Sequence, residues 1–193
     1  MDKVKTALEI ALERAKAIEV DEEKILELEN LPRGRVLGAQ FLSNKDFNLE
    51  EELQKFNGKA KAHVVKGVEE TFLGNLRLPR DGNSMETNRR CMEGLLLIKK
   101  NKAALKQVFK EIEMLFQYYA RALEQAYVNL KEEYAARLAQ AGRSLGKQVV
   151  PLRLPNVETL PEFQEEWLRF REQLSAQYET LLEEKRQYIR SIS

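Results

Sequence analysis

Apolar residues recur every three or four positions along most of the chain, as in helices with one buried face. The first stripe follows Asp2, a good N-cap residue, and is in helical phase. Its members are Val4, Leu8, Ala11, Ala15 and Ile18. The helix continues or restarts at Asp21 and is expected to end at Pro32, because a residue before proline avoids helical geometry. Residues 35–47 fit either a short helix or extended chain.

A second helical segment is predicted to begin after Asn48, a capping residue followed by three glutamates that the helix dipole favours. Its stripe comprises Leu49, Leu53, Phe56, Ala60, Val64, Val68, Phe72 and Leu76. Gly58, directly after Asn57, disfavours a continuous helix, although the helical spacing of the apolar residues continues across it. The pattern therefore allows one helix weakened at Gly58, or two helices separated there.

The longest pattern begins after a turn at residues 78–83, where Asn83 and Glu86 resemble a capping box. No proline and one glycine, Gly94, occur between there and Ala141. Apolar residues repeat with heptad spacing at Leu95, Ile98, Leu105, Phe109, Ile112, Phe116, Tyr119, Leu123, Tyr127, Leu130, Tyr134 and Leu138. This pattern predicts one helix over about residues 84–141, roughly 87 Å long. A break within the polar run 99–102 is the alternative.

A glycine- and proline-containing connector, residues 142–161, separates this helix from a last one. The last helix is expected to open at Thr159–Glu162, a capping box with Pro161 in its first turn. Its stripe has heptad-like spacing and comprises Phe163, Trp167, Phe170, Leu174, Tyr178, Leu181, Lys185, Tyr188 and Ile192. The connector is long enough for this helix to pack on its own chain or on another subunit.

These patterns together predict an all-α fold: an elongated helical bundle or antiparallel coiled coil built on the long helix. Residues 1–78 are expected to pack on the first half of that helix. Residues 79–193 would supply the long helix, the connector and the last helix, in one continuous unit. The composition agrees, because nine glycines and five prolines among 193 residues leave few helix breakers.

The sequence also indicates the cellular compartment in which the protein is expected. A single cysteine excludes an internal disulfide framework and favours a reducing environment. The N-terminus lacks the apolar core of a signal peptide, and no apolar run approaches the length of a membrane span. We therefore expect a cytoplasmic protein without a membrane partner.

The net charge of +1 conceals a strong segregation along the chain. Residues 1–30 carry nine acidic against five basic residues, a balance of −4. Residues 77–110 carry nine basic against three acidic residues, a balance of +6, and residues 158–184 carry two basic against eight acidic residues, a balance of −6. Acidic helices can therefore pair with a basic one within the chain or between chains.

Motifs for catalysis, cofactors or metals are not found in the sequence. His63 is the only histidine and has no glutamate three or four residues before it, so the ligand pattern of di-iron bundles is missing. One histidine and one cysteine are too few for a usual zinc site. Residues 142–147 lack the spacing of a phosphate-binding loop. We therefore predict no catalytic residue, no cofactor and no metal, and a protein that is not an enzyme.

Two local features have competing interpretations. Cys91 follows Arg89 and Arg90, whose charges would lower the pKa of a thiol, but a buried packing cysteine is the simpler explanation. Gly34 and Gly38, near two arginines, fit weakly with an anion site at a helix start.

The basic run supplies the best candidate for an interaction or anion-binding surface. Its six predicted residues are Arg77, Arg80, Arg89, Arg90, Lys99 and Lys100. Binding of nucleic-acid phosphates is one explanation. A solvated face, or a dock for the acidic helices, is favoured because the net charge is near zero and Phe109 and Phe116 belong to the heptad stripe.

The predicted function is that of a structural or protein-interaction protein, a scaffold or adaptor that presents helical surfaces. Its predicted partners are a second copy, forming a homodimer through the heptad stripe, and another protein. A binder of nucleic-acid backbones is the second interpretation, and a helical enzyme of unrecognised type is the third.

Overall fold

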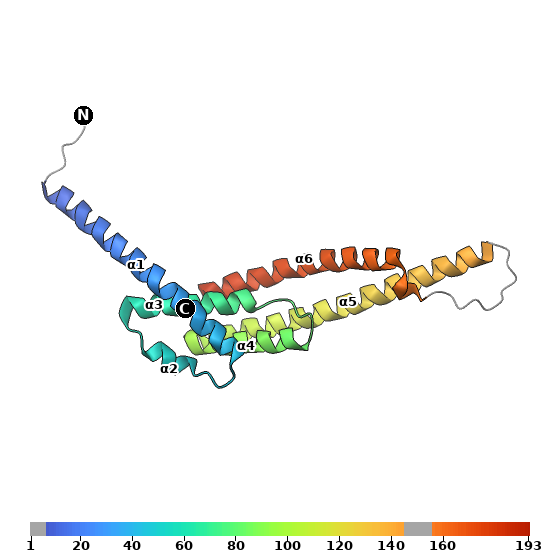
Figure 1. The fold of residues 1–193 in the computed structure, drawn as a ribbon, viewed down its shortest axis with the longest axis horizontal. Helices are drawn as coiled ribbons and strands as arrows, with labels where there is room; N and C mark the ends of the chain where they lie inside the picture. Colours follow the sequence, from blue (N-terminus) through green and yellow to red (C-terminus); the bar gives the residue numbers. More distant parts are fainter. Residues whose placement is uncertain (1–6, 145–155) are drawn as a thin grey trace, which may run out of the picture. The chain divides into compact units, whose positions relative to one another are not determined.

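The computed structural model describes the backbone of residues 7–144 and 156–193 (Figure 1). Every element in these ranges is helical, which confirms the all-α prediction. The elements are α1 (Ala7–Ser43), α2 (Leu49–Gln54), α3 (Gly58–Asn75), α4 (Gly82–Ile98), α5 (Lys102–Ser144), the 3-10 turn η1 (Val157–Thr159) and α6 (Pro161–Ser191). Residues 145–155 of the predicted connector, which was expected over 142–161, lie outside the described residues.

The chain forms two compact units. The first unit comprises Met1–Leu76 and Met85–Lys100, and the second comprises Arg77–Ser84 and Asn101–Ser193. Helix α4 therefore groups with the N-terminal helices, and α5 groups with α6. The predicted continuity of the whole chain as one unit stays a prediction.

Helix α1 is longer than the sequence predicted. It runs through Pro32 to Ser43, so the predicted end at Pro32 is wrong, and residues 35–43 are helical. Proline removes one backbone hydrogen bond, the one to the carbonyl of Leu28. Both residues lie on the exposed side of α1, where water can replace the lost bond.

Helices α1 and α3 cross where two glycines face each other. A Cβ atom added to Gly34 would lie 2.0 Å from the carbonyl oxygen of Val64, and one added to Gly67 would lie 2.2 Å from that of Leu31. Only hydrogen fits at either position, so the two backbones touch. The predicted anion site at Gly34 and Gly38 is therefore wrong: both glycines lie within a helix, and Gly38 packs against Thr71.

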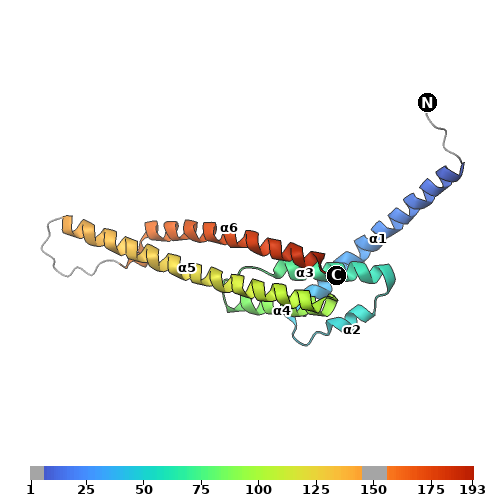
Figure 2. The same ribbon diagram turned by 180° about the vertical axis from the view of Figure 1, so that it is seen from behind.

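The two crossing helices run parallel to each other. Lys59, at the start of α3, bonds Glu23 at 2.8 Å, and Arg35 bonds Glu70 further along both helices at 2.9 Å. Helix α2 lies in the return connection and is capped by Asn48, whose side chain accepts from the Glu51 N–H. Figure 2 shows α1 continuing beyond the start of α3 with no other helix of the first unit alongside that stretch.

The alternatives left open at Gly58 are settled in favour of two helices. Helix α2 ends at Gln54, and α3 begins at Gly58, whose φ of 55° lies in the left-handed region. Glycine adopts this conformation without the steric cost that a side chain would add. Helix α4 then packs on α3, because a Cβ added to Gly94 would lie 2.3 Å from the Phe72 ring.

The predicted helix over residues 84–141 is broken. Helix α4 ends at Ile98 and α5 begins at Lys102, so the very long helix exists but starts later than predicted. The side chain of Lys99 turns to Glu69, 2.8 Å away in the first unit. Asn101 caps α5, because its side-chain oxygen accepts from the Ala104 N–H at 3.1 Å. Likewise the predicted cap of α4, Asn83, is replaced by Asp81, which accepts from the Ser84 N–H.

Helices α5 and α6 form an antiparallel hairpin within the second unit. Glu111, near the start of α5, pairs with Lys185 near the end of α6, whereas Lys131 pairs with Glu158 just before α6. The central part of the heptad stripe is buried in the chain. Its buried members include Leu105, Phe109, Ile112, Phe116, Tyr119 and Leu130. The last helix thus packs on its own chain and has Pro161 in its first turn, as predicted. The predicted capping box is wrong, because the N-cap is Leu160, without a side-chain hydrogen bond, and the Thr159 hydroxyl donates to the Asn156 carbonyl.

Candidate interaction surface

The six basic residues predicted as one surface are divided between the two units. Arg77 and Arg80 belong to the second unit, and the other four belong to the first. Arg80 is exposed, and its N–H donates to the Ser84 hydroxyl. Lys100 is exposed in the short break after α4. The sequence grouped these residues by proximity along the chain, which the fold only partly preserves.

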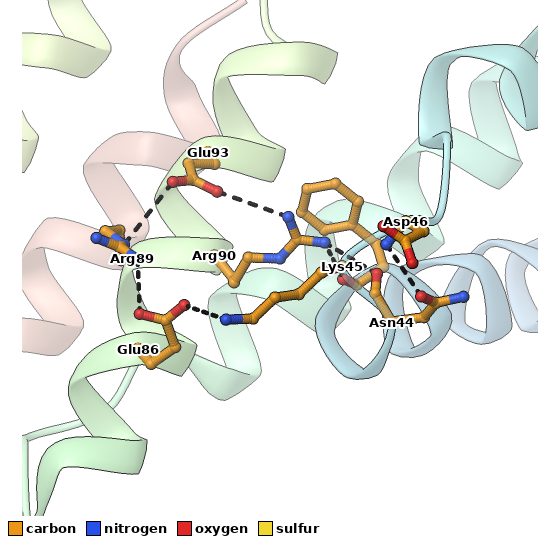
Figure 3. Close-up of polar contacts among 8 residues, drawn as sticks. Asn44, Lys45, Asp46, Glu86, Arg89, Arg90 and Glu93 are labelled. Carbon is orange, nitrogen blue, oxygen red and sulfur yellow. Dashed lines mark hydrogen bonds and ion pairs between the residues drawn. The ribbon is translucent and has the colours of Figure 1, made fainter.

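Arg90 closes the C-terminal end of α1. Its Nη2 donates to the carbonyl oxygens of Phe41, at 2.6 Å, and Asn44, at 3.1 Å (Figure 3). The guanidinium also lies 4.0 Å from the centre of the Phe41 ring, and Nη1 is 3.7 Å from Glu93. A cation that satisfies the last carbonyls of a helix and opposes its dipole stabilises that helix end. Arg90 is thus occupied by a structural role.

Arg89 and Lys45 share one carboxylate. Arg89 Nη2 lies 2.7 Å from Glu86, and Lys45 Nζ lies 3.3 Å from the other oxygen of the same group (Figure 3). Hydrogen bonds from Arg89 and then Lys45 lower the pKa of Glu86 from its ordinary value. Glu93 stands 3.9 Å from Arg89 on the next turn. Carboxylates from α4 itself therefore neutralise much of its positive charge.

Lys99 is the most enclosed of the six. Its side chain is 10% exposed, and its ammonium group lies 2.8 Å from Glu69 on α3. The pair fastens the end of α4 to α3. Arg89, Arg90 and Lys99 are therefore all engaged by acidic groups or carbonyls of the first unit, and the predicted anion-binding role of the run stays a prediction.

Cys91 is a packing residue. Its side chain is fully buried, and burial raises the pKa of the thiol to about 12. The thiol is therefore neutral at physiological pH and weakly nucleophilic, whatever the charge of its arginine neighbours. His63 lies 3.7 Å from Glu23, between α3 and α1. Among the described residues, no three histidine, cysteine or acidic side chains are placed to hold a metal ion.

Helix α1 exposes an apolar stripe that the sequence interpretation missed. Ile25, Leu28 and Val36 are 55%, 74% and 56% exposed, although α1 turns Gly34 and Phe41 inwards. The sequence interpretation ended the helix at Pro32 and so placed Val36 in a different element from Ile25 and Leu28. Their shared helix face was therefore not recognised. The spacing of three and then eight residues is the signal that a continuous helix would have revealed.

A second exposed apolar group lies on α6. It consists of Phe170, Leu181 and Tyr188, which lie beside the face that α6 turns to α5. Their predicted place in the packed stripe of the last helix is therefore wrong, and Leu182 and Ile189 are buried instead. None of the helices in the described part of the chain is both long and apolar enough to cross a membrane.

These observations define an all-α protein that combines a glycine-crossed parallel helix pair with an antiparallel helix hairpin. Residues 50–191 match the family DUF6657, described as a family of unknown function, and the chain belongs to this family. Helix α1 precedes the matched region. No curated protein and no solved structure matches the chain.

Proposed function

We propose that this protein is a non-enzymatic interaction protein, a scaffold or adaptor that presents helical surfaces, first of all to a second copy of itself. The exposed stripe of α1 carries the proposal. Ile25, Leu28 and Val36 are large aliphatic residues in line on one helix face, and the opposite face is already packed on α3. Exposed apolar side chains that form a patch are typical of interaction sites, whereas scattered ones need no explanation.

The contacts of the basic run make nucleic-acid binding the less favourable alternative. A phosphate group would have to compete with Glu86 for Arg89, with Glu69 for Lys99 and with two carbonyls for Arg90. Each exchange replaces an existing charge-assisted bond, so little free energy would be gained. The acidic partners of the run at these positions are Glu86, Glu93 and Glu69, which lie outside the acidic segments 1–30 and 158–184.

Sedimentation equilibrium of the full chain in the micromolar range tests the proposal. We expect concentration-dependent self-association that changes little with salt, because apolar burial rather than exposed charge drives it. In parallel, fluorescence anisotropy with random single- and double-stranded nucleic acids should give no binding. A strictly monomeric protein would contradict the proposed self-association. Nucleic-acid binding that falls steeply with salt would instead support the alternative function.

A further inference from the structure

We infer that two copies of the chain pair through α1, antiparallel, about a twofold axis that passes between Glu29 and Arg33. The inference rests on the proposed function, because it names the surface and the register of the self-association. It commits to a second copy as the occupant of the apolar stripe formed by Ile25, Leu28 and Val36.

The stripe has the form of a helix-pairing face. At about 100° per residue, Leu28, Pro32, Ile25 and Val36 fall within a sector of roughly 80° on α1. This sector lies opposite Gly34 and Gly38, which contact α3. A helix that packs on α3 with one side can therefore receive a second helix on the other side without any change in its own fold.

The charges beside the stripe identify the partner as another α1 and set its direction. Glu29 and Arg33 are exposed, lie one turn apart on the same border of the stripe, and form no ion pair with any residue that the structure describes. In an antiparallel pair, the same border of each helix meets its counterpart. Glu29 of each copy then faces Arg33 of the other, which gives two symmetric ion pairs.

The parallel arrangement is less favourable, because it brings opposite borders together. Arg33 of one copy would then lie near the level of Arg35 of the other, which already pairs with Glu70, so Arg33 gains no partner of opposite charge there. In the antiparallel register, Ile25 of one copy instead lies within about one residue, roughly 1.5 Å, of the level of Val36 of the other. Apolar contacts and charge pairs therefore agree on one register.

The heptad stripe of α5 is not available for this role. Phe109 and Phe116 are buried within the chain, so the surface on which the sequence predicted a dimer is already covered. One helix from each copy makes an interface near the low end of stable sizes, about 1,200 Å² in total. We therefore expect dissociation in the micromolar range.

Leu28→Glu tests the surface. Because Leu28 is 74% exposed, the variant should keep its fold and melting temperature but dimerise at least about tenfold more weakly, since it places a charge in the interface. Leu181→Glu on α6 is the matched control, because it adds the same charge to the exposed apolar group of α6. Ile25→Gln and Val36→Gln provide milder second variants in case Leu28→Glu is poorly folded.

A charge exchange tests the direction. Glu29→Arg and Arg33→Glu should each weaken the dimer, and the double variant should restore it, because the two pairs re-form with reversed signs. A double variant that stays as weak as the single ones would overturn the antiparallel register. Sedimentation equilibrium measures all of these dissociation constants.

The outcomes separate this inference from the proposed function. A dimer that Leu181→Glu dissociates and Leu28→Glu leaves intact would overturn the α1 surface while the interaction function stands. A wild-type chain that stays monomeric throughout the micromolar range would overturn both. Loss of the dimer in Leu28→Glu alone, with rescue in the double charge exchange, would establish the paired α1 helices.

Discussion

The two units hold their helices together by opposite means. In the first unit, α1 and α3 meet at Gly34 and Gly67, where the backbones are in contact and no side chain intervenes. In the second unit, α5 and α6 are separated by rings: the tilted rings of Tyr119 and Tyr178 have centroids 5.3 Å apart, and the edge-to-face rings of Tyr127 and Trp167 have centroids 5.1 Å apart. The size of the residues at the contact sets the distance between helices.

This difference also determines which kind of substitution destabilises each helix contact. The hairpin buries large apolar area and adds hydrogen bonds from its tyrosines, such as Tyr119 to Ser175 at 2.8 Å and Tyr134 to Glu166 at 2.6 Å. Truncation should therefore damage the hairpin. The glycine crossing has nothing to truncate, and only enlargement can disturb it.

The largest effect is expected from emptying the hairpin core. Phe116→Ala should lower the free energy of unfolding by about 3–5 kcal/mol, because the ring is 3% exposed and its removal leaves a cavity. Urea denaturation followed by circular dichroism measures the change. Tyr118→Ala, two residues away but exposed, is the control and should change stability little. Equal effects of the two variants would contradict the assigned core.

Enlarging the crossing should come next. Gly67→Ala should cost about 2–3 kcal/mol, because the new methyl group would lie 2.2 Å from the Leu31 carbonyl oxygen, a backbone atom that cannot turn away. The penalty should exceed the gain in helix propensity, about 1 kcal/mol. Gly74→Ala, on the same helix with open space around its Cβ, should be neutral or stabilising. A stabilised Gly67→Ala protein would contradict the close crossing.

Removing the end cap of α1 should cost somewhat less. Arg90→Met keeps the aliphatic stem but loses the hydrogen bonds to Phe41 and Asn44, which should cost about 2 kcal/mol. The neighbouring Arg89→Met removes only exposed ion pairs and should leave the melting temperature nearly unchanged. Comparable losses in both variants would show that general charge, rather than the helix cap, is responsible.

The smallest effect concerns the start of α5. Asn101→Ala removes the side-chain acceptor for the Ala104 N–H and should cost about 1 kcal/mol. Asn101→Asp keeps an acceptor oxygen and should retain most of the stability. Thermal unfolding measures both variants, and an unaffected Asn101→Ala protein would argue against this cap.

Local patterns were sufficient to predict the two long helices of the hairpin and the central part of the α5 stripe, but the stripe of α6 was only partly correct, because Leu182 and Ile189 are buried in place of Leu181 and Tyr188. Phe109 and Phe116 follow a spacing that needs no distant information, and Pro161 marks the start of α6 by its own geometry. The crossing was missed for the opposite reason. Gly34 looks like a helix end unless Gly67, thirty-three positions further on, is known to lie against it.

The break after α4 and the basic run show the same limit. Lys99 fits a continuous helix by local pattern, but its partner Glu69 lies on α3, thirty residues earlier. The sequence identified Arg89 and Arg90 as a concentration of charge, yet the carbonyls of Phe41 and Asn44 that engage Arg90 are invisible to any motif. Partners that are distant in the sequence therefore determine which basic side chains of the run remain available to bind another molecule.

The direction of the α1–α3 pair has a consequence for how the chain folds. Contacts in the hairpin span 27 residues at Lys131–Glu158, 56 at Tyr119–Ser175 and 74 at Glu111–Lys185, so the hairpin can close from its connector outwards. Contacts between the parallel helices span 36 residues at Glu23–Lys59 and 35 at Arg35–Glu70, with no short loop to begin from. The first contact between α1 and α3, wherever it forms, must therefore offset the entropy lost in closing this loop. During synthesis, α1 therefore has no α3 to pair with until the ribosome has passed Gly67.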